Sequence, residues 1–168
     1  MRAPSQQILS VERVFGTHGW HCEMLEGRDV LRAQFSAHHG KILLHAQSYT
    51  PINALSIVGE SPLPLTRTHQ PYLLELLMRA NMQLNLGAFE YDLDRKQMAF
   101  RITNIFEREQ YDADIVTSMV HCAIAEMDRM LPFAATVQRH ASDTLPDLNL
   151  ALLLQREDLL PPVPEELD

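Results

Sequence analysis

Residues 30–49 read VLRAQFSAHHGKILLHAQSY, and apolar and polar side chains alternate along both halves of this stretch. The apolar positions are Leu31, Ala33, Phe35 and Ala37, followed by Ile42, Leu44 and Ala46. Successive side chains of a strand point to opposite faces, so each half predicts a strand with one buried face and one wetter face. His39 and Gly40 lie between the halves and predict a tight turn. The stretch therefore predicts an antiparallel hairpin.

Further strands and helices are expected on both sides of this hairpin. Period-two patterns predict short strands over 20–25 and 54–58, and a second hairpin with strands over 89–93 and 98–102. Apolar residues instead recur with the helical period of 3.6 over residues 4–15, 71–87 and 112–131. Gly16 and Gly87 are expected to end the first two helices, because glycine is common just beyond a helix end.

The resulting order of elements is α-β-β-β-β-α-β-β-α. Antiparallel hairpins combined with helices predict an α+β two-layer sandwich, with the helices packed on one face of the sheet. We interpret residues 1–142 as one domain and residues 143–168 as a leucine-rich, acidic extension with a proline-rich end. Residues 148–154 fit a strand by their alternation or a short helix by their leucine content. In either form we expect them to dock, because an exposed leucine-rich segment favours aggregation.

The charge distribution argues against nucleic-acid and membrane partners. The chain of 168 residues has 14 basic and 22 acidic residues, which give a net charge of −8. Most of this charge lies in residues 141–168, so the rest of the chain is nearly neutral. Nucleic acids and anionic membranes are bound through clustered Lys and Arg, which this sequence lacks. Because no uncharged run approaches ~18 residues and no signal-peptide pattern opens the chain, we expect a cytoplasmic protein.

Two neighbouring motifs carry a resemblance to a known family. Residues 73–81 read LLELLMRAN, and residues 87–92 read GAFEYD. This pair resembles the YbjN-like family of bacterial sensory transduction regulators, and the similarity extends over residues 4–140. The resemblance implies a fold like that of type III secretion chaperones, which are small, acidic, dimeric α+β proteins that bind segments of other proteins. No catalytic residues are known for the family, so the resemblance implies none here.

Three groups of histidine and cysteine side chains are candidates for metal binding or thiol catalysis. They are His18, His21 and Cys22; then His38, His39 and His45; and the pair His121 and Cys122. Neighbouring residues of a strand or a helix point in different directions, so none of these groups is expected to converge on one ion or one reacting atom. We therefore expect no metal site, no cofactor and no catalytic residue. Cys22 is expected to be a small core residue, and the turn histidines are expected to have no role.

The helix expected over 71–87 is apolar on most of its circumference. Its core stripe is Leu73, Leu76, Leu77, Ala80 and Leu84. A second apolar row, formed by Leu74, Met78 and Met82, follows at i, i+4 and i+8 and needs cover of its own. The N-terminal helix or the leucine-rich extension could supply this cover. The alternative is a surface for a homodimer or a client polypeptide, to which flexible methionine side chains are well suited.

These features favour a non-catalytic, chaperone- or adaptor-like regulatory protein that binds a client or regulatory polypeptide and forms a homodimer. The expected partner-binding residues are Leu74, Met78, Met82, Leu148, Leu150, Leu152 and Leu154. The alternative is a small-molecule-binding regulator or a small enzyme with a pocket between sheet and helices. An exposed apolar patch favours the first function, whereas a concave cavity with convergent polar side chains favours the second.

Overall fold

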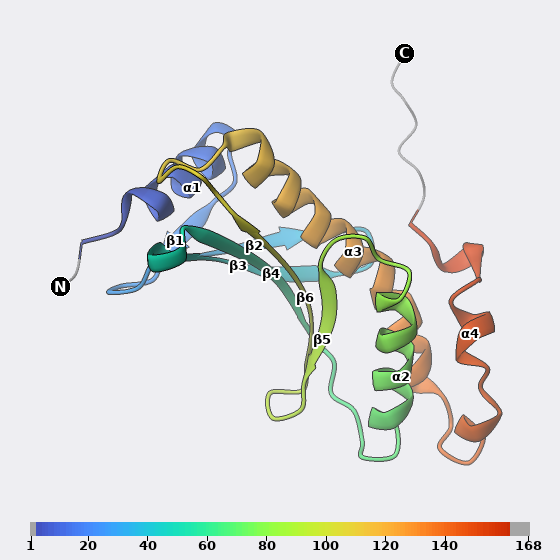
Figure 1. Cartoon of the computed structure of the whole chain (residues 1–168). Helices are drawn as coiled ribbons and strands as arrows, with labels where there is room; N and C mark the ends of the chain where they lie inside the picture. Colours follow the sequence, from blue (N-terminus) through green and yellow to red (C-terminus); the bar gives the residue numbers. More distant parts are fainter. Residues whose placement is uncertain (1–2, 162–168) are drawn as a thin grey trace.

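A computed structural model describes residues 3–161 of the chain (Figure 1). The helices are α1 (Gln6–Thr17), α2 (Gln70–Asn81), α3 (Ala113–Arg139) and the short α4 (Leu150–Leu153). The strands are β1 (Cys22–Met24), β2 (Val30–Ser36), β3 (Lys41–Tyr49), β4 (Ala54–Pro62), β5 (Ala88–Asp92) and β6 (Gln97–Ile105). The predicted order of helices and strands is therefore confirmed. Residues 162–168, which hold most of the proline-rich end of the predicted extension, lie outside the described residues.

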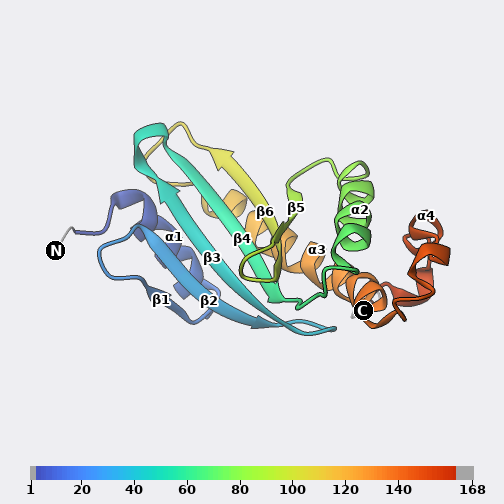
Figure 2. The same cartoon turned by 90° about the horizontal axis from the view of Figure 1, so that it is seen from below.

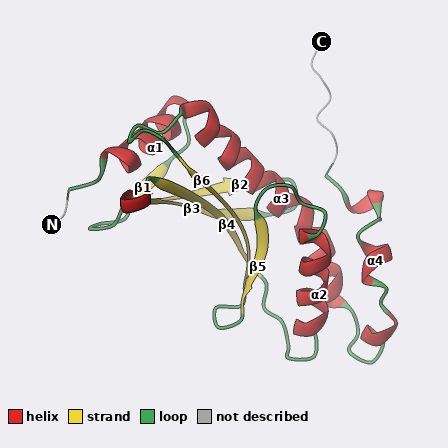
Figure 3. Ribbon diagram, in the orientation of Figure 1, coloured by secondary structure: helices red, strands yellow, loops and turns green. Residues whose placement is uncertain are grey.

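The six strands form one antiparallel sheet in the order β1-β2-β3-β4-β6-β5. Helices α1 and α3 pack on one face of this sheet, and α2 packs beside β5 at its edge. Figure 2 looks at the opposite face, where the strands lie in front of both helices. Figure 3 shows the same division into a helical layer and a strand layer. The predicted α+β architecture, with helices on one face, is confirmed.

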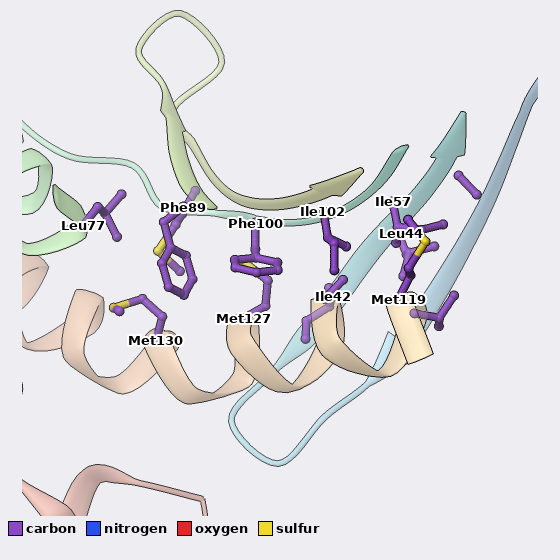
Figure 4. Packing of buried hydrophobic residues seen from close by; sticks show 14 of the residues in the cluster. Ile42, Leu44, Ile57, Leu77, Phe89, Phe100, Ile102, Met119, Met127 and Met130 are labelled. Carbon is purple, nitrogen blue, oxygen red and sulfur yellow. The ribbon is translucent and has the colours of Figure 1, made fainter. Parts of the chain in front are cut away.

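The hydrophobic core lies between the sheet and α3. Strand register places Leu44 opposite Gly59, and Gly59 opposite Phe100, so these residues share the face that α3 covers. Phe100 points from β6 toward Met127 of α3 (Figure 4). Position 59 leaves little room for a side chain, because a Cβ atom there would lie 3.1 Å from Cγ of Met127. The sheet and α3 therefore approach most closely where β4 lacks a side chain.

The ends of α1 and α2 differ from the prediction. Helix α1 continues through Gly16 and ends beside Gly19, whose φ of 68° suits glycine. Helix α2 ends at Asn81, six residues before Gly87. The Asn81 side chain accepts a hydrogen bond from the Phe89 main-chain N–H at 2.7 Å and donates one to the Phe89 carbonyl at 3.1 Å. Asn81 thus joins the end of α2 to the outer edge of β5, and the chain crosses to that strand as a loop.

Helix α3 is longer than predicted, since it passes Leu131 and Pro132 and continues to Arg139. Its buried stripe also continues beyond the proline. The added buried residues are Phe133, Ala134 and Val137. Burial of this stripe against the core offsets the helix-breaking tendency of the proline, which alone would end the helix.

The C-terminal extension packs on its own chain as a helix rather than a strand. Asn149 caps α4 by accepting a hydrogen bond from the Leu152 N–H at 3.0 Å. Leu145, Leu150 and Leu153 are buried, and α4 contacts α2, beside which it lies in Figure 1. Of the two forms expected for residues 148–154, the structure therefore has the short helix. The division at residue 142 stays a prediction.

Candidate functional site

The second apolar row of α2, formed by Leu74, Met78 and Met82, is exposed. The exposed fractions of these residues are 41%, 64% and 84%. The opposite face of the helix carries the buried residues Leu73, Leu76, Leu77 and Ala80. Helix α4 contacts α2 but leaves the row uncovered, so neither of the covers considered from the sequence is realised within residues 3–161. We call Leu74, Met78 and Met82 the α2 row.

The loop that leads from α2 to β5 carries a further exposed apolar residue. Leu86 in this loop is 67% exposed and lies at the mouth of a cavity between β6 and α3. The cavity has a volume of about 330 Å³. Its lining residues are Leu86, Ile102, Thr103, Asn104, Asp114, Ile115, Ser118, Met119 and Cys122. This β6–α3 cavity is a pocket between sheet and helices, the feature on which the alternative function depends.

The sequence pattern does not reveal this cavity, because the helical period predicts that Leu86 lies in the last turn of a longer helix. The signal that could have located it is Gly87. Its φ is 72°, and a Cβ atom there would lie 2.4 Å from the Phe100 ring and 2.7 Å from the Arg101 carbonyl oxygen. A residue that must be glycine at this point indicates that the chain turns sharply against β6 rather than ending a helix.

Cys122 lines the cavity as a neutral thiol. Burial, with a smaller contribution from Glu126, raises its pKa above the ordinary value, so the reactive thiolate is disfavoured. The ring of the neighbouring His121 contacts Trp20, with the ring centroids 5.5 Å apart. The His121 ring therefore packs on another part of the chain, and the absence of a nucleophile–base pair stays a prediction from helical geometry.

Three other candidate histidines, His18, His45 and His39, contact other groups. His18 stacks on Trp20 with 4.3 Å between ring centroids. His45 lies 3.5 Å from a carboxylate oxygen of Glu60. His39 contacts Asp128 through both its main chain and its ring, so the expectation that the turn histidines have no role is wrong for His39. Among residues 3–161, no three His, Cys, Asp or Glu side chains are grouped so that they could hold a metal ion.

The four leucines predicted to bind a partner lie in and around α4. Leu150 is buried, and Leu148 and Leu154 pack partly buried against the core. Only Leu152 is exposed, at 59%. Leu153, which is not among the four predicted leucines, is buried. Three of the four predicted leucines are therefore engaged with their own chain, and a partner could reach them only if the segment detached.

The face of the sheet opposite the helices is polar. Ion pairs join Arg32 to Glu23 at 2.9 Å and Arg101 to Glu90 at 2.8 Å across neighbouring strands. Such exposed pairs contribute little stability, but their charges keep this face solvated. Of the exposed large apolar residues, Leu74, Met78 and Met82 lie on α2, and Leu86 and Ile115 line the β6–α3 cavity. Within the described part of the chain, every helix is too short or too polar to cross a lipid bilayer.

Comparison with known proteins identifies a fold and no sequence family. No protein-family model matches the sequence, and no curated protein matches it. Among solved structures, the chain is similar to YbjN from E. coli, which is described as a candidate transcription regulator. The match has a TM-score of 0.51 at 6% sequence identity and covers 69% of this chain and 82% of YbjN. The chain therefore has a distant YbjN-like α+β fold.

Proposed function

We propose that this chain is a non-catalytic, chaperone- or adaptor-like regulatory protein that binds other polypeptides and forms a homodimer in the bacterial cytoplasm. The observation that carries the proposal is the exposed α2 row, together with the exposed Leu86 beside the β6–α3 cavity. Exposed apolar groups gathered on one side of a protein are typical of interaction sites. Methionine side chains suit such a site because they adapt their shape to different partners.

The electrostatics of the chain support a polypeptide partner over a nucleic acid. The net charge is −8, most of it in residues 141–168, and the nearly neutral remainder lacks the clustered Lys and Arg that bind a phosphate backbone. The YbjN-like fold supports a regulatory role, because YbjN is described as a candidate regulator. Cys122 gives no support to an enzyme, since burial keeps its thiol protonated.

The substitution Met78→Asp tests the proposal. It places a charge at the centre of the α2 row, where the side chain is exposed and folding does not depend on it. Gln83→Glu is the matched control, because it adds the same charge at an exposed position outside the row. Light scattering measures the oligomeric state, and the binding of reduced, carboxymethylated α-lactalbumin measures capture of an unfolded polypeptide.

We expect Met78→Asp to weaken both dimerisation and capture at least about tenfold, because a buried unpaired charge costs a few kcal/mol in an interface. Gln83→Glu should leave both unchanged. If the wild-type chain is a monomer that captures no unfolded polypeptide, the proposal is wrong.

The β6–α3 cavity supports a second candidate, a small-molecule-binding regulator or a small enzyme. Its lining combines apolar side chains with a few polar ones, as ligand pockets do. Ser118→Phe would fill the cavity from α3 without touching the α2 row. Saturable binding of a small apolar fluorophore that Ser118→Phe abolishes, in a wild-type chain that captures no polypeptide, would favour this second function.

A further inference from the structure

Strand β6 is longer than the strand that pairs with it on its outer side. On one side, β4 pairs with β6 along its whole length, from Gln97 to Ile105. On the other side, β5 pairs only with residues 97–101. Among residues 3–161, no strand pairs with residues 102–105 on that outer side. We call this stretch the free edge of β6.

The main-chain groups at the free edge can be assigned from the neighbouring pairs. The main chain of Phe89 is bonded to Asn81 on the outer side of β5, so Phe89 and its partner Phe100 do not bond each other. The N–H and C=O groups of alternate residues point to opposite sides of a strand. Phe100 therefore faces β4, as does Phe106, whose N–H donates to the Asn53 carbonyl at 2.9 Å.

By the same alternation, the main-chain groups of Thr103 and Ile105 face the free edge. No hydrogen bond to these groups is present on that side within the described part of the chain. Thr103 and Ile105 are themselves exposed residues. Unpaired main-chain donors and acceptors along an extended strand are a template for another strand.

The edge stays open because of Gly87. The close approach of Gly87 to the Phe100 ring and the Arg101 carbonyl turns the chain away from β6 immediately before β5 begins. Because β5 begins only at Ala88, Leu86 does not extend this strand along the free edge, and it lines the β6–α3 cavity instead. A strand that filled the gap would have to come from elsewhere.

A groove runs beside the free edge, and it is apolar along the β6–α3 cavity and polar beyond Asn104. The β6–α3 cavity has Ile102 to Asn104 of β6 as one wall and the first turns of α3, including Ile115 and Met119, as the other. A second cavity of about 350 Å³ shares Asn104 and Ile115 with the first and continues past Ile105 to Arg108. The groove therefore follows the strand direction, which is the geometry that an added strand needs for the side chains on its inner face.

We propose that an extended segment of a partner polypeptide binds by adding a strand to the free edge of β6. Its main chain exchanges hydrogen bonds with Thr103 and Ile105, and its alternate apolar side chains enter the groove against Ile115 and Met119. This inference rests on the proposed function and deepens it, because it names the site and the chemistry of the bound segment.

Charge around the groove specifies the flanks of that segment. The acidic side chains of Glu107, Asp112 and Asp114 line the two cavities, against one basic side chain, Arg108. The partner segment should therefore carry Lys or Arg beside its alternating apolar residues. The chain's own last residues, PVPEELD at 162–168, are acidic and rich in proline, so their composition does not match.

The first test uses the fluorescein-labelled peptide Lys-Val-Thr-Val-Thr-Val-Lys and fluorescence polarisation. Thr103→Pro removes the N–H that faces the free edge without removing a bond to β4, and proline is tolerated at such edge positions. Thr103→Val is the matched control, because it keeps the N–H and the branched side chain. We expect Thr103→Pro to weaken peptide binding about tenfold, as loss of a main-chain hydrogen bond should, and Thr103→Val to leave it unchanged.

A second test, amide hydrogen exchange, uses the wild-type protein, so it tests strand addition even if Thr103→Pro does not fold. In the free protein, amide hydrogen exchange should be fast at Thr103 and Ile105 and slow at Ile102 and Asn104. The peptide should slow exchange at Thr103 and Ile105 at least about tenfold, and the same peptide with N-methyl groups on its valines should not. Peptide binding that leaves both amides fast overturns the inference.

Two further outcomes separate this inference from the proposed function. If Thr103 and Ile105 are protected without peptide, and the protection rises with protein concentration, a second copy of the chain occupies the edge and the inference is wrong. If Met78→Asp abolishes capture of unfolded polypeptide whereas Thr103→Pro does not, the inference also fails, but the proposed function stands. If neither the peptide nor the unfolded polypeptide binds the wild-type chain, both fail.

Discussion

Nδ1 of His39 lies 3.1 Å from the main-chain oxygen of Asp128, a carbonyl that α3 leaves without its helical partner. In a helix this oxygen would accept from the N–H four residues later, but that residue is Pro132, which has none. Because a carbonyl only accepts, Nδ1 of His39 must carry the proton. The main-chain N–H of His39 also donates to Oδ1 of Asp128 at 2.6 Å. The loop between β2 and β3 thus supplies the hydrogen-bond donor that Pro132 cannot give to the Asp128 carbonyl.

This relationship predicts that the effect of His39→Ala depends on residue 132. In the wild-type background, loss of the imidazole should lower the free energy of unfolding by about 1 kcal/mol, because the buried Asp128 carbonyl loses its donor. In the Pro132→Ala background the loss should be smaller, because the substituted alanine supplies the missing N–H. Urea unfolding of the four proteins measures the coupling as a double-mutant cycle.

His38→Ala is the control, since His38 lies in the same loop but makes no hydrogen bond to α3 within the described residues. His38→Ala should lower the free energy of unfolding by the same small amount in the wild-type and the Pro132→Ala backgrounds. Equal costs of His39→Ala with and without Pro132 would show that the imidazole does not replace the missing helical bond.

The same relationship shows where prediction from the sequence stops. The periods of two and 3.6 sufficed for the order of helices and strands along the chain and for locating the α2 row, because both depend on neighbouring residues. A proline after Leu131 predicts a helix end, but burial of the stripe beyond it and the donor that His39 supplies to Asp128, 89 residues away, let the helix continue. Likewise, α2 ends where Asn81 meets Phe89, and the free edge of β6 exists because Gly87 turns the chain away. These features depend on contacts between elements, which no local pattern encodes.

Gly87→Ala should destabilise the protein far more than Gly27→Ala. Both glycines have φ near 70°, so alanine costs about 1–2 kcal/mol at either position for conformation alone. A Cβ atom at Gly27 meets nothing within 4 Å, whereas at Gly87 it would overlap the Phe100 ring. Overpacking should add about 1–3 kcal/mol at Gly87 only. Chemical denaturation of both variants measures the difference, and equal losses would contradict the close approach to Phe100.

Stability should fall in mild acid partly because of His45. Burial lowers the pKa of His45 below its ordinary value, and this outweighs the opposing effect of the nearby Glu60 carboxylate. The unfolded chain therefore takes up this proton before the folded protein does. The contribution of the neutral His45 to the free energy of unfolding is fully present above a pH of about 6.5. It is lost as the pH falls toward the lowered pKa of the folded protein.

His45→Gln should accordingly reduce the loss of unfolding free energy between pH 7.5 and pH 5.5. The same substitution at the exposed His21 is the control and should leave the loss unchanged. Denaturant titrations at the two pH values measure both. If the His45 variant loses as much stability as the wild type, burial of the imidazole does not contribute to acid sensitivity.

The docking of the C-terminal segment as a helix predicts which of its leucines matter. A docked strand would bury Leu150 and Leu152 together, since side chains two apart share a face, whereas helix α4 buries Leu150 and Leu153 and leaves Leu152 exposed. Leu150→Ala and Leu153→Ala should therefore each lower the free energy of unfolding by about 2–5 kcal/mol, because each leaves a cavity against the core. Leu152→Ala should change it by less than about 0.5 kcal/mol. A large effect at Leu152 with a small one at Leu153 would indicate a strand, and small effects at all three would mean that the segment does not stay docked on α2.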